Sequence, residues 1–312
     1  MEILVDILIL NWNGFELTRN CIKSIKKHCC GNYRIIVVDN DSKDGSSQKL
    51  KNVFEDVVIL QSDTNLGYAG GNNFGLSRIL EERKSKYTLV LNNDTEAEDD
   101  FLTKLVQIFE EDQQCGLVTP IIFYLIPKDK KIVWGIGGKV NFWIGKFRSR
   151  YQGVDYLSIH KDLIDNDIDY VTGCCFLIKN DLAKDLNLFK ENYFAYYEDT
   201  DLSFRVKEKG FKLRVSKDSF IRHVAGASTK NEKKGLNPLV WYLNIRNQIW
   251  FFKRHAKPYH YITYPIILIF KLAFFVLVFM LKRNFKKINF AIRGFFDGVF
   301  YDDSSFKKCI PH

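Results

Sequence analysis

Three carboxylates stand close together in the second half of the chain, in the run Glu198-Asp199-Thr200-Asp201. They follow an aromatic stretch from Tyr193 to Tyr197, which is able to stack on a sugar ring or to exclude water. A carboxylate at the start of a helix can take a proton from an attacking hydroxyl group, which is the chemistry of a general base. The cluster could instead cap the helix, or Asp201 could pair with Arg205 four residues further on. We favour Asp199 as the base.

Polar residues also follow four apolar segments in the first third of the chain, at Asn11, Asp39, Asn65 and Asn92-Asn93-Asp94. Asp94 offers a hard oxygen ligand of the kind that divalent cations prefer, although this segment could also cap a turn. Asp39 ends an apolar run, where an ionised carboxylate is costly unless a ligand or backbone donors meet it. For Asp41 and Ser42 the pattern favours a structural turn.

A glycine-rich segment runs from Asn65 to Asn73. Because glycine lets backbone approach a ribose or a diphosphate closely, we predict a turn near such a group, formed by Asn65, Gly67, Gly70, Gly71 and Asn72. The spacing is not that of a dinucleotide fingerprint, and the glycines at 135–138 lack the helix that this fingerprint requires. His223 is a lone histidine, which by itself favours a structural role, and Arg222 beside it could contact phosphate or lie on a solvated face.

Alternating strands and helices are predicted to position these residues. Apolar runs predict strands at 3–10, 34–38, 57–60, 87–91 and 117–119, and helical spacing predicts helices at 17–29, 46–54, after the glycine-rich turn to about 82, and at 101–110. This order predicts an α/β fold with a mostly parallel sheet covered by helices on both faces. Ligands bind at the carboxyl ends of such strands, which is where the polar residues fall.

The pattern is less regular beyond residue 120. Residues 132–153, which include Trp134, are rich in glycine and aromatic residues and predict a hairpin or mobile loops. We expect a strand at 170–178, a helix at 199–209 that Gly210 ends, and a strand at 212–216. His223 then lies a short stretch beyond the last strand.

The basic residues are concentrated in the last quarter of the chain. The 46 Lys and Arg against 37 Asp and Glu give a net charge of +9, which alone would suggest a polyanionic partner. From Lys230 onward there are 15 basic and 4 acidic residues, against 31 and 33 before it. Residues 265–281 are apolar except for Lys271 and have basic residues on both flanks. This favours a helical segment embedded in, or lying along, an anionic membrane surface, with a helix packed on the protein as the alternative.

Composition excludes several classes of protein. The 312 residues are 46% hydrophobic and 27% charged with a slightly negative mean hydropathy, which excludes disordered, collagen-like and polytopic membrane proteins. The interleaving of basic and apolar residues, without a recognisable binding motif, argues against a nucleic-acid partner. Seven cysteines without C-x-x-C spacing indicate a reducing compartment, and the acidic start at Met1–Asp6 gives no sign of a signal peptide.

Six motifs follow one another along the chain: Leu10-Asn11-Trp12-Asn13-Gly14, Val38-Asp39-Asn40-Asp41-Ser42, Asn65 to Asn73, Leu91-Asn92-Asn93-Asp94, Thr172-Gly173-Cys174 and Glu198-Asp199-Thr200-Asp201-Leu202. With this set the chain resembles the family 2 glycosyltransferases of the GT-A fold, a Rossmann-like fold, and among them the rhamnosyltransferase-like branch that builds bacterial surface polysaccharides. The resemblance runs from about residue 5 to 300, since 242–247 and 293–298 also match. Each motif is weak alone, and their order makes the set specific.

The resemblance implies a role for each candidate residue. Asp94 belongs to the metal motif, in which Asn92 replaces the usual first aspartate, and His223 is a metal ligand, so the cofactor is a divalent cation, Mg²⁺ or Mn²⁺. Asp39 bonds the imide N–H of uracil or thymine. The nucleotide-sugar-binding set comprises Asn11, Asn13, Asp39, Asp41, Asn65, Gly67, Gly71, Asn72, Asn92 and Asn93. Asp199 is the catalytic base, and Glu198, Asp201 and Trp134 contact the acceptor or support the site.

These inferences predict an inverting, metal-dependent glycosyltransferase on the cytoplasmic side of the cell membrane. The donor is a UDP- or dTDP-sugar, with dTDP-rhamnose among the candidates, and the acceptor is lipid-linked or a growing surface polysaccharide. Residues 1–235 form the GT-A catalytic domain, and residues 236–312 form a basic, helical, membrane-associated region. The alternative, motivated by Asn92, is a catalytically silent scaffold that binds a sugar nucleotide or glycan in a polysaccharide biosynthesis complex.

Overall fold

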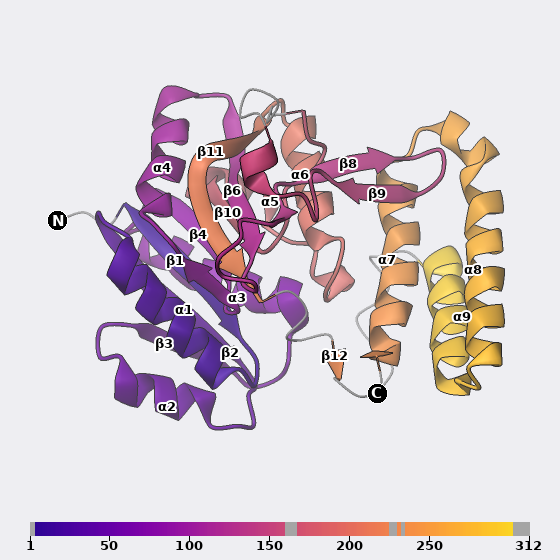
Figure 1. Cartoon of the computed structure of the whole chain (residues 1–312), viewed down its shortest axis with the longest axis horizontal. Helices are drawn as coiled ribbons and strands as arrows, with labels where there is room; N and C mark the ends of the chain where they lie inside the picture. Colours follow the sequence, from indigo (N-terminus) through magenta and orange to yellow (C-terminus); the bar gives the residue numbers. More distant parts are fainter. Residues whose placement is uncertain (1–3, 160–166, 225–229, 232–234, 302–312) are drawn as a thin grey trace. The chain divides into compact units, whose positions relative to one another are not determined.

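Parallel strands form the N-terminal half of the sheet, as the alternating pattern predicts. The computed structural model describes residues 4–159, 167–224, 230–231 and 235–301. The first strands are β1 (Val5–Asn11), β2 (Tyr33–Asn40), β3 (Val58–Ser62) and β4 (Tyr87–Asn92), and the helices between and after them are α1 (Phe15–His28), α2 (Ser46–Val53), α3 (Gly67–Glu82) and α4 (Phe101–Glu111). Strand β1 pairs in parallel with β2 and β4, and β2 with β3 (Figure 1).

The other half of the sheet is mixed. The strand order is β3-β2-β1-β4-β10-β6-β11-β5, with β7 paired to β6. Its members are β5 (Thr95–Ala97), β6 (Cys115–Tyr124), β7 (Val133–Gly135), β10 (Cys175–Lys179) and β11 (Lys212–His223). Strand β10 runs antiparallel to both β4 and β6, while β6 and β11 are parallel. Strand β11 is longer than predicted, so His223 is its last residue and does not lie beyond it.

Helices cover both faces of this sheet because successive strand residues point to opposite sides. Ile7 and Ile9 of β1 join a core with apolar residues of α1 and α4, whereas Leu8 joins a second core with residues of α3, α5 (Asn180–Leu186) and α6 (Glu198–Glu208). Helix α6 is followed by Gly210, which has a φ of +85°, in agreement with the predicted helix end.

The prediction of a turn for the glycine-rich segment is wrong from Gly67 onward, because α3 begins there. A Cβ on Gly71 would lie 2.5 Å from Cδ1 of Leu10, and one on Gly75 would lie 2.3 Å from Cδ1 of Leu8. These glycines therefore let the helix lie close to the sheet, and they do not line a loop. Local propensity disfavours glycine in a helix, and close packing outweighs it here.

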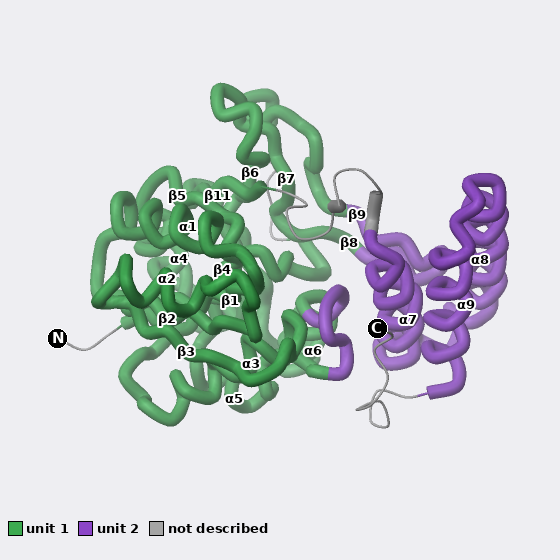
Figure 2. The backbone as a smooth tube through the Cα atoms, turned by 90° about the horizontal axis from the view of Figure 1, so that it is seen from below, with its two compact units in different colours: residues 1–139, 149–191, 199–225 green, residues 140–148, 192–198, 226–312 purple. Residues whose placement is uncertain are grey.

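The glycine- and aromatic-rich segment does form a hairpin, from β8 (Gly138–Asn141) and β9 (Lys146–Ser149). Its tip belongs to a second compact unit, made of residues 140–148, 192–198 and 226–312, and the other residues form the first unit (Figure 2). This division differs from a single boundary at residue 235, since two internal segments join the C-terminal part. The second unit also contains the short pair β12 (Lys230–Asn231) and β13 (Gly235–Leu236).

Three helices dominate the second unit: α7 (Pro238–His255), α8 (Tyr264–Leu281) and α9 (Phe285–Phe300). Helices α7 and α9 approach so closely at Gly294 that a Cβ there would lie 2.6 Å from the Tyr242 carbonyl oxygen. The hydroxyl of Tyr242 donates to Oδ2 of Asp297 over 2.8 Å. Within the described residues, α8 is the helix that is long and apolar enough to cross a membrane, by length and composition only.

Candidate active site

The parallel pairing of β1 and β2 places Asn11 opposite Asp39 at the carboxyl ends of both strands. Nδ2 of Asn11 donates to Oδ2 of Asp39 over 3.2 Å, and the backbone N–H of Ser42 donates to Oδ1 over 2.8 Å. These donors satisfy the carboxylate as the sequence argument requires. Asp39 has no exposed surface, so contact with a nucleotide base requires the side chains around it to shift.

Predicted binding residues hold one another and the adjoining loops. Oδ1 of Asn11 accepts from Oγ1 of Thr18 over 2.7 Å, and Nδ2 of Asn93 donates to the same Thr18 oxygen over 2.9 Å. Oδ1 of Asn13 accepts from the backbone N–H of Lys43 over 2.7 Å. Asp41 has a φ of +63° and pairs with Lys43, in keeping with a turn. The network thus fixes the shape of the strand-end loops.

Asn40 was missed by sequence reasoning, although it lies within a quoted motif. Its Nδ2 donates to Oδ1 of Asn65 and to the carbonyl of Gly67, both over 3.1 Å, and its Oδ1 accepts from the backbone N–H of Leu66 over 2.9 Å. Asn40 therefore fixes the entry to α3. Asn72 is buried and donates to the Tyr68 carbonyl within that helix, so its place is in the core and not on a ligand-facing loop.

Asp94 and His223 meet although they lie far apart in the sequence. Strand β5 pairs antiparallel with β11 so that Thr95 is opposite His223. Nε2 of His223 then lies 3.1 Å from Oδ1 of Asp94, and each side chain is only 7% exposed. Trp134 packs edge-on against the imidazole with ring centroids 4.4 Å apart, which is a supporting contact.

The donor atoms of this pair are of the types that divalent cations bind. Oδ1 of Asp94 and Nδ1 of His223 are buried and make no hydrogen bond among the described residues, because the approach of His223 Nε2 to Oδ1 lacks hydrogen-bond geometry. An unpaired buried polar atom is costly, and carboxylate oxygen and imidazole nitrogen are both common metal ligands. The part of the chain that the structure describes contains no group of three or more His, Cys, Asp or Glu suited to a metal, so a cation here would take its other ligands from donor phosphates or water.

Asp199 is half-buried at the start of α6, with both carboxylate oxygens hydrogen-bonded. Oδ2 accepts from the backbone N–H of Gly173 over 2.7 Å, and Oδ1 accepts from the backbone N–H of Thr200 over 2.6 Å. The hydroxyl of Tyr68 donates to the Gly173 carbonyl over 2.6 Å. Burial raises the pKa of the Asp199 carboxyl above its ordinary value, against the lowering effect of these hydrogen bonds, and so makes it a stronger base.

Gly173 and Cys174 join Asp199 to the strand end that carries Asp94. Gly173 donates to Asp199, and the carbonyl of the next residue, Cys174, accepts from the backbone N–H of Asn92 over 2.9 Å. Asn92 lies two residues before Asp94. The pairing of β10 with β4 thus brings the Thr172-Gly173-Cys174 motif beside the Leu91-Asn92-Asn93-Asp94 motif.

The other two carboxylates of the cluster differ from Asp199. Asp201 has no exposed surface and pairs with Arg205, whose Nε lies 2.7 Å from Oδ2 of Asp201. Arg205 also donates to the carbonyls of Leu186 and Leu188, over 2.8 and 2.6 Å. Asp201 is therefore structural, and the pairing alternative is correct. Glu198 is 5% exposed. Burial raises the pKa of the Tyr196 hydroxyl to about 12, and the negative charge of Glu198 adds to this rise.

Asp201→Asn is expected to lower the free energy of unfolding by about 3–5 kcal/mol, because it leaves Arg205 buried without its countercharge. Chemical denaturation of wild type and variant measures the change. The matched control is Asp185→Asn, which breaks the exposed Lys209–Asp185 pair and should cost at most about 1 kcal/mol. Equal effects of the two substitutions would contradict a structural role for Asp201.

Activity is expected to fall as the pH decreases. The fall should begin at a higher pH than it would if the base were an ordinary aspartate, whose pKa is about 3.9. The base acts only when ionised, and its raised pKa means that protons bind earlier as the pH falls. Because the folded state binds this proton more tightly than the unfolded chain, protonation of Asp199 does not itself destabilise the fold. The pH profile of kcat/KM, with unfolding followed in parallel, tests this. An acid limb at or below the ordinary pKa would contradict it.

Arg222 does not offer its charge to a phosphate. It is 4% exposed, pairs with Glu98, and donates to the carbonyls of Tyr124 and Lys130, both over 3.0 Å. Its guanidinium group fastens the loop after β6, and this occupies its donors. The buried, paired guanidinium group agrees with neither of the two alternatives left open for Arg222, a phosphate contact or a solvated face.

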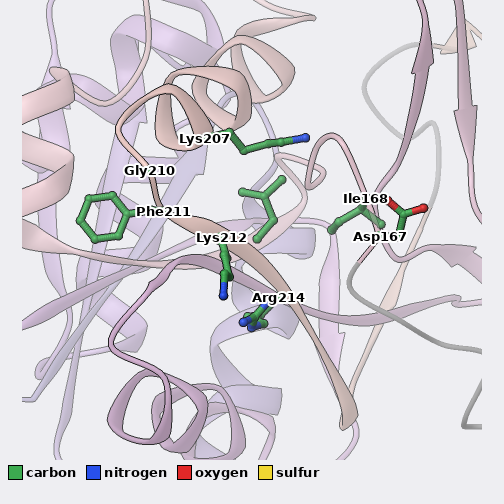
Figure 3. Close-up of a pocket in the computed structure, with 8 residues that line it drawn as sticks. Asp167, Ile168, Lys207, Gly210, Phe211, Lys212 and Arg214 are labelled. Atoms are coloured by element: carbon green, nitrogen blue, oxygen red, sulfur yellow. The ribbon is translucent and has the colours of Figure 1, made fainter.

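A pocket lies where β11 begins, at the opposite end of that strand from His223 (Figure 3). It is lined by Asp167, Ile168, Lys207, Gly210, Phe211, Lys212, Leu213 and Arg214. Two of its cations have acidic partners, since Arg214 pairs with Asp112 and Lys207 lies 3.2 Å from Asp169. None of the predicted site residues lines it, and strand length separates it from the candidate site.

Known proteins resemble this chain in sequence. It is 24% identical over 211 residues to the low-salt glycan biosynthesis hexosyltransferase Agl10 of Haloferax volcanii, a match that covers 67% of this chain and 63% of the relative. It is 22% identical over 210 residues to the N-acetylglucosaminyl-diphospho-decaprenol L-rhamnosyltransferase of Mycobacterium tuberculosis, covering 63% of this chain and 68% of the relative. The chain thus matches less than two thirds of the length of Agl10.

Solved structures share the fold. GalNAc-T7, solved with UDP, GalNAc and Mn²⁺, superposes with a TM-score of 0.62 at 15% identity, over 81% of this chain and 48% of its own. The mannosyltransferase PcManGT of Pyrobaculum calidifontis, solved with GDP-Man and Mn²⁺, gives 0.57 at 12% identity, over 96% and 88%. The sequence model of the family described as Glycosyl transferase family 2 matches residues 6–186, more than half of the chain. With the GT-A fold and the ordered strand-end motifs, this match shows that the chain belongs to glycosyl transferase family 2.

Proposed function

We propose that this chain is an inverting, metal-dependent glycosyltransferase that uses a nucleotide-sugar donor. The observation that carries the proposal is the link from Asp199 through Gly173 and Cys174 to the strand end that bears Asp94 and His223. The link joins a carboxylate of raised pKa to a pair of atoms suited to a cation, and sugar transfer from a nucleotide calls for both.

In the proposed reaction Asp199 takes the proton of an acceptor hydroxyl as that oxygen attacks the anomeric carbon of the donor sugar. The bond from this carbon to the diphosphate breaks, and attack from the opposite side inverts the configuration. Asp94 and His223 would hold the divalent cation, Mg²⁺ or Mn²⁺. When bound, the cation offsets the negative charge that develops on the departing diphosphate.

We propose a UDP- or dTDP-sugar as donor, with dTDP-rhamnose as the first to test, and a lipid-linked or growing glycan as acceptor. A relative named as a rhamnosyltransferase acting on a decaprenol-linked sugar supports both choices. The loops held by Asn11, Asp39 and Asn40 frame the strand ends at which nucleotides bind in open α/β sheets.

A panel of nucleotide sugars, screened for thermal stabilisation with Mn²⁺ and then for transfer to a lipid-linked acceptor, tests the function. Stabilisation by a donor followed by metal-dependent transfer is the expected result. If the chain binds a donor but neither transfers its sugar nor hydrolyses it, with or without metal, the result would instead indicate the silent scaffold that Asn92 in the metal motif suggests. No binding of any nucleotide sugar would contradict both.

We further propose that α8 lies along a membrane on its cytoplasmic side. Its exposed apolar side chains follow the helical repeat as single residues or adjacent pairs, at Ile266, Ile269, Phe270, Phe274, Leu277, Met280 and Leu281. This spacing places them on one face, as in a helix that lies in the interface. Basic residues beyond the helix, including Lys282, Lys286 and Lys287, suit anionic headgroups. The six cysteines in the described part are free, which agrees with a reducing compartment.

Lys271 argues for a helix in the membrane plane and against one that crosses. Its Nζ donates to the carbonyls of Ile144 and Gly145 in the hairpin tip, both over 2.9 Å. Thr263, just before α8, donates to the Trp143 carbonyl over 2.6 Å. A bilayer-spanning α8 would carry this irregular loop into the hydrocarbon, where exposed backbone polar groups are costly.

Phe270→Ser/Phe274→Ser is expected to weaken binding to vesicles of phosphatidylglycerol and phosphatidylcholine at least about tenfold, because a buried Phe contributes about 1.5–3 kcal/mol. Both side chains are more than 60% exposed and free to insert. Cosedimentation measures the change, with Phe74→Ser on the exposed surface of α3 as control. Salt should release the wild type only in part, and complete release at moderate salt would count against insertion.

A further inference from the structure

The six residues before Glu198 have an unusual backbone. Phe194, Tyr196 and Tyr197 have φ angles of 65°, 72° and 74°. This left-handed region is disfavoured for residues with a side chain, and aromatic residues rarely occupy it. Such conformations persist only where surrounding contacts over-determine them. The contacts around this segment must therefore be strong.

Two adjacent side chains of α7 supply these contacts. Nδ2 of Asn247 donates to the carbonyls of Tyr193, Ala195 and Tyr196, over 2.9, 2.8 and 2.8 Å. Nη2 of Arg246 donates to the carbonyls of Asn192 and Tyr193, both over 3.0 Å. Four of the six carbonyls in the segment are thus bound by one Arg-Asn pair.

The pair is itself held rigidly. Nε of Arg246 donates to Oδ1 of Asn247 over 2.9 Å, so both functional groups of the asparagine amide have defined partners. Both residues have no exposed surface. The guanidinium group lies 4.3 Å from the ring centroid of Trp250 and 5.1 Å from that of Tyr242, where cation–π attraction offsets part of its desolvation. A buried cation with so many specified contacts is costly for a purely structural turn.

The held segment leads directly into the candidate base. Tyr197 is followed by Glu198, the first residue of α6, and then by Asp199. Asp199 is fixed on its other side by Gly173 and Thr200. If the backbone before α6 relaxed to ordinary negative φ angles, the direction in which the chain enters the helix would change, and the Asp199 carboxylate would move with it.

We propose that Arg246 and Asn247 are positioning residues for Asp199, which they hold in place through the backbone of residues 192–197. The inference rests on the proposed role of Asp199 as the base. Misplacement of a catalytic group by about 1 Å can cost about 10²-fold in rate, so the pair affects the chemical step without touching substrate.

The test uses Asn247→Asp, which keeps the size of the side chain and its contact with Nε of Arg246 but replaces the donating NH₂ with an oxygen that repels the carbonyls. The matched control is Asn244→Asp on the same helix, because Nδ2 of Asn244 donates only to the Val240 carbonyl of its own turn among the described residues. Arg246→Lys is a milder second variant that keeps the charge. Each protein is studied as the full chain.

We expect hydrogen exchange of the amides of residues 192–199 to be at least about tenfold faster in Asn247→Asp than in wild type or Asn244→Asp. We expect kcat to fall by about 10–100-fold, while KM for the donor and the calorimetric affinity for the nucleotide stay unchanged. Arg246→Lys should give a smaller change of the same kind. A merely structural pair would lower stability and nucleotide affinity together.

Unchanged exchange in Asn247→Asp would overturn the proposal, as would faster exchange with an unchanged kcat. If Asn247→Asp does not fold, the same criteria apply to Arg246→Lys. A wild-type chain that binds nucleotide sugars but transfers none would overturn the proposed function together with this inference. Transfer by the wild type combined with an insensitive Asn247→Asp would overturn the positioning role alone.

Discussion

Asp199→Asn is expected to lower kcat for sugar transfer by about 10²–10⁴-fold while the affinity for the nucleotide stays within about twofold. The amide keeps the shape of the carboxylate and can still accept from the backbone N–H of Gly173. It cannot take a proton from the acceptor hydroxyl. The loss should therefore appear in the chemical step, measured by steady-state transfer kinetics beside calorimetric titration of the nucleotide.

The control for this substitution is Asp181→Asn, an exposed aspartate in the first turn of α5. It removes the same charge near a helix start but belongs to neither the strand-end network nor the α6 cluster. We expect it to be within about twofold of wild type in kcat. Full turnover by Asp199→Asn would show that Asp199 is not the base. Because Asp201 is buried in an ion pair, a different residue would then have to accept the proton.

Asp94→Asn is expected to abolish the gain in nucleotide affinity that Mn²⁺ brings to the wild type, a loss of at least about tenfold. Even the loss of an outer-shell partner commonly costs a metal site about 10–100-fold, and this substitution weakens one of the two proposed protein ligands. Affinity in the absence of metal should change little, since the strand-end loops are held by Asn11, Asp39 and Thr18. Calorimetric titration of UDP and dTDP with and without Mn²⁺ measures both quantities.

Asp63→Asn, in the exposed loop after β3, is the matched control for Asp94→Asn. Equal metal dependence in Asp94→Asn and the wild type would show that the Asp94–His223 pair does not hold the cation. Asp199→Asn and Asp94→Asn also separate the two roles of the site, because Asp199→Asn should keep the metal-dependent nucleotide affinity that Asp94→Asn loses.

The choice between Asp199 and Asp201 shows a limit of sequence reasoning. Two residues apart on a helix, they point in nearly opposite directions, and the sequence does not say which direction faces the core. The sequence shows that Arg205 could pair with Asp201, but it does not show whether such an ion pair would be buried or exposed. The structure shows Asp201 buried in an ion pair with Arg205, whose other donors bind backbone carbonyls. Of these two aspartates, this leaves Asp199 as the candidate base.

The glycine-rich segment shows a second limit. Gly67, Gly70 and Gly71 predict a loop because glycine weakens a helix, yet α3 begins at Gly67. The helix forms because residues lacking a Cβ can approach Leu10 and Leu8 of β1, which is a gain made only in the folded chain. Likewise, the role of Arg246 and Asn247 depends on backbone angles at 192–197, which have no local signal in the sequence.

The sequence by itself determined the order of the strands and helices in the first 120 residues except for the short strand β5, the polar residues at the strand ends, the carboxylate cluster at 198–201, and the apolar helix near the C-terminus. These follow from periodicity and residue type, which are local properties. The tertiary structure decided which of these residues meet. Asp94 reaches His223 through the register of β5 on β11, and Asp199 reaches the Asn92 strand end through Gly173 and Cys174. Pairing between distant segments depends on how the whole chain packs, and so it cannot be read from any one segment.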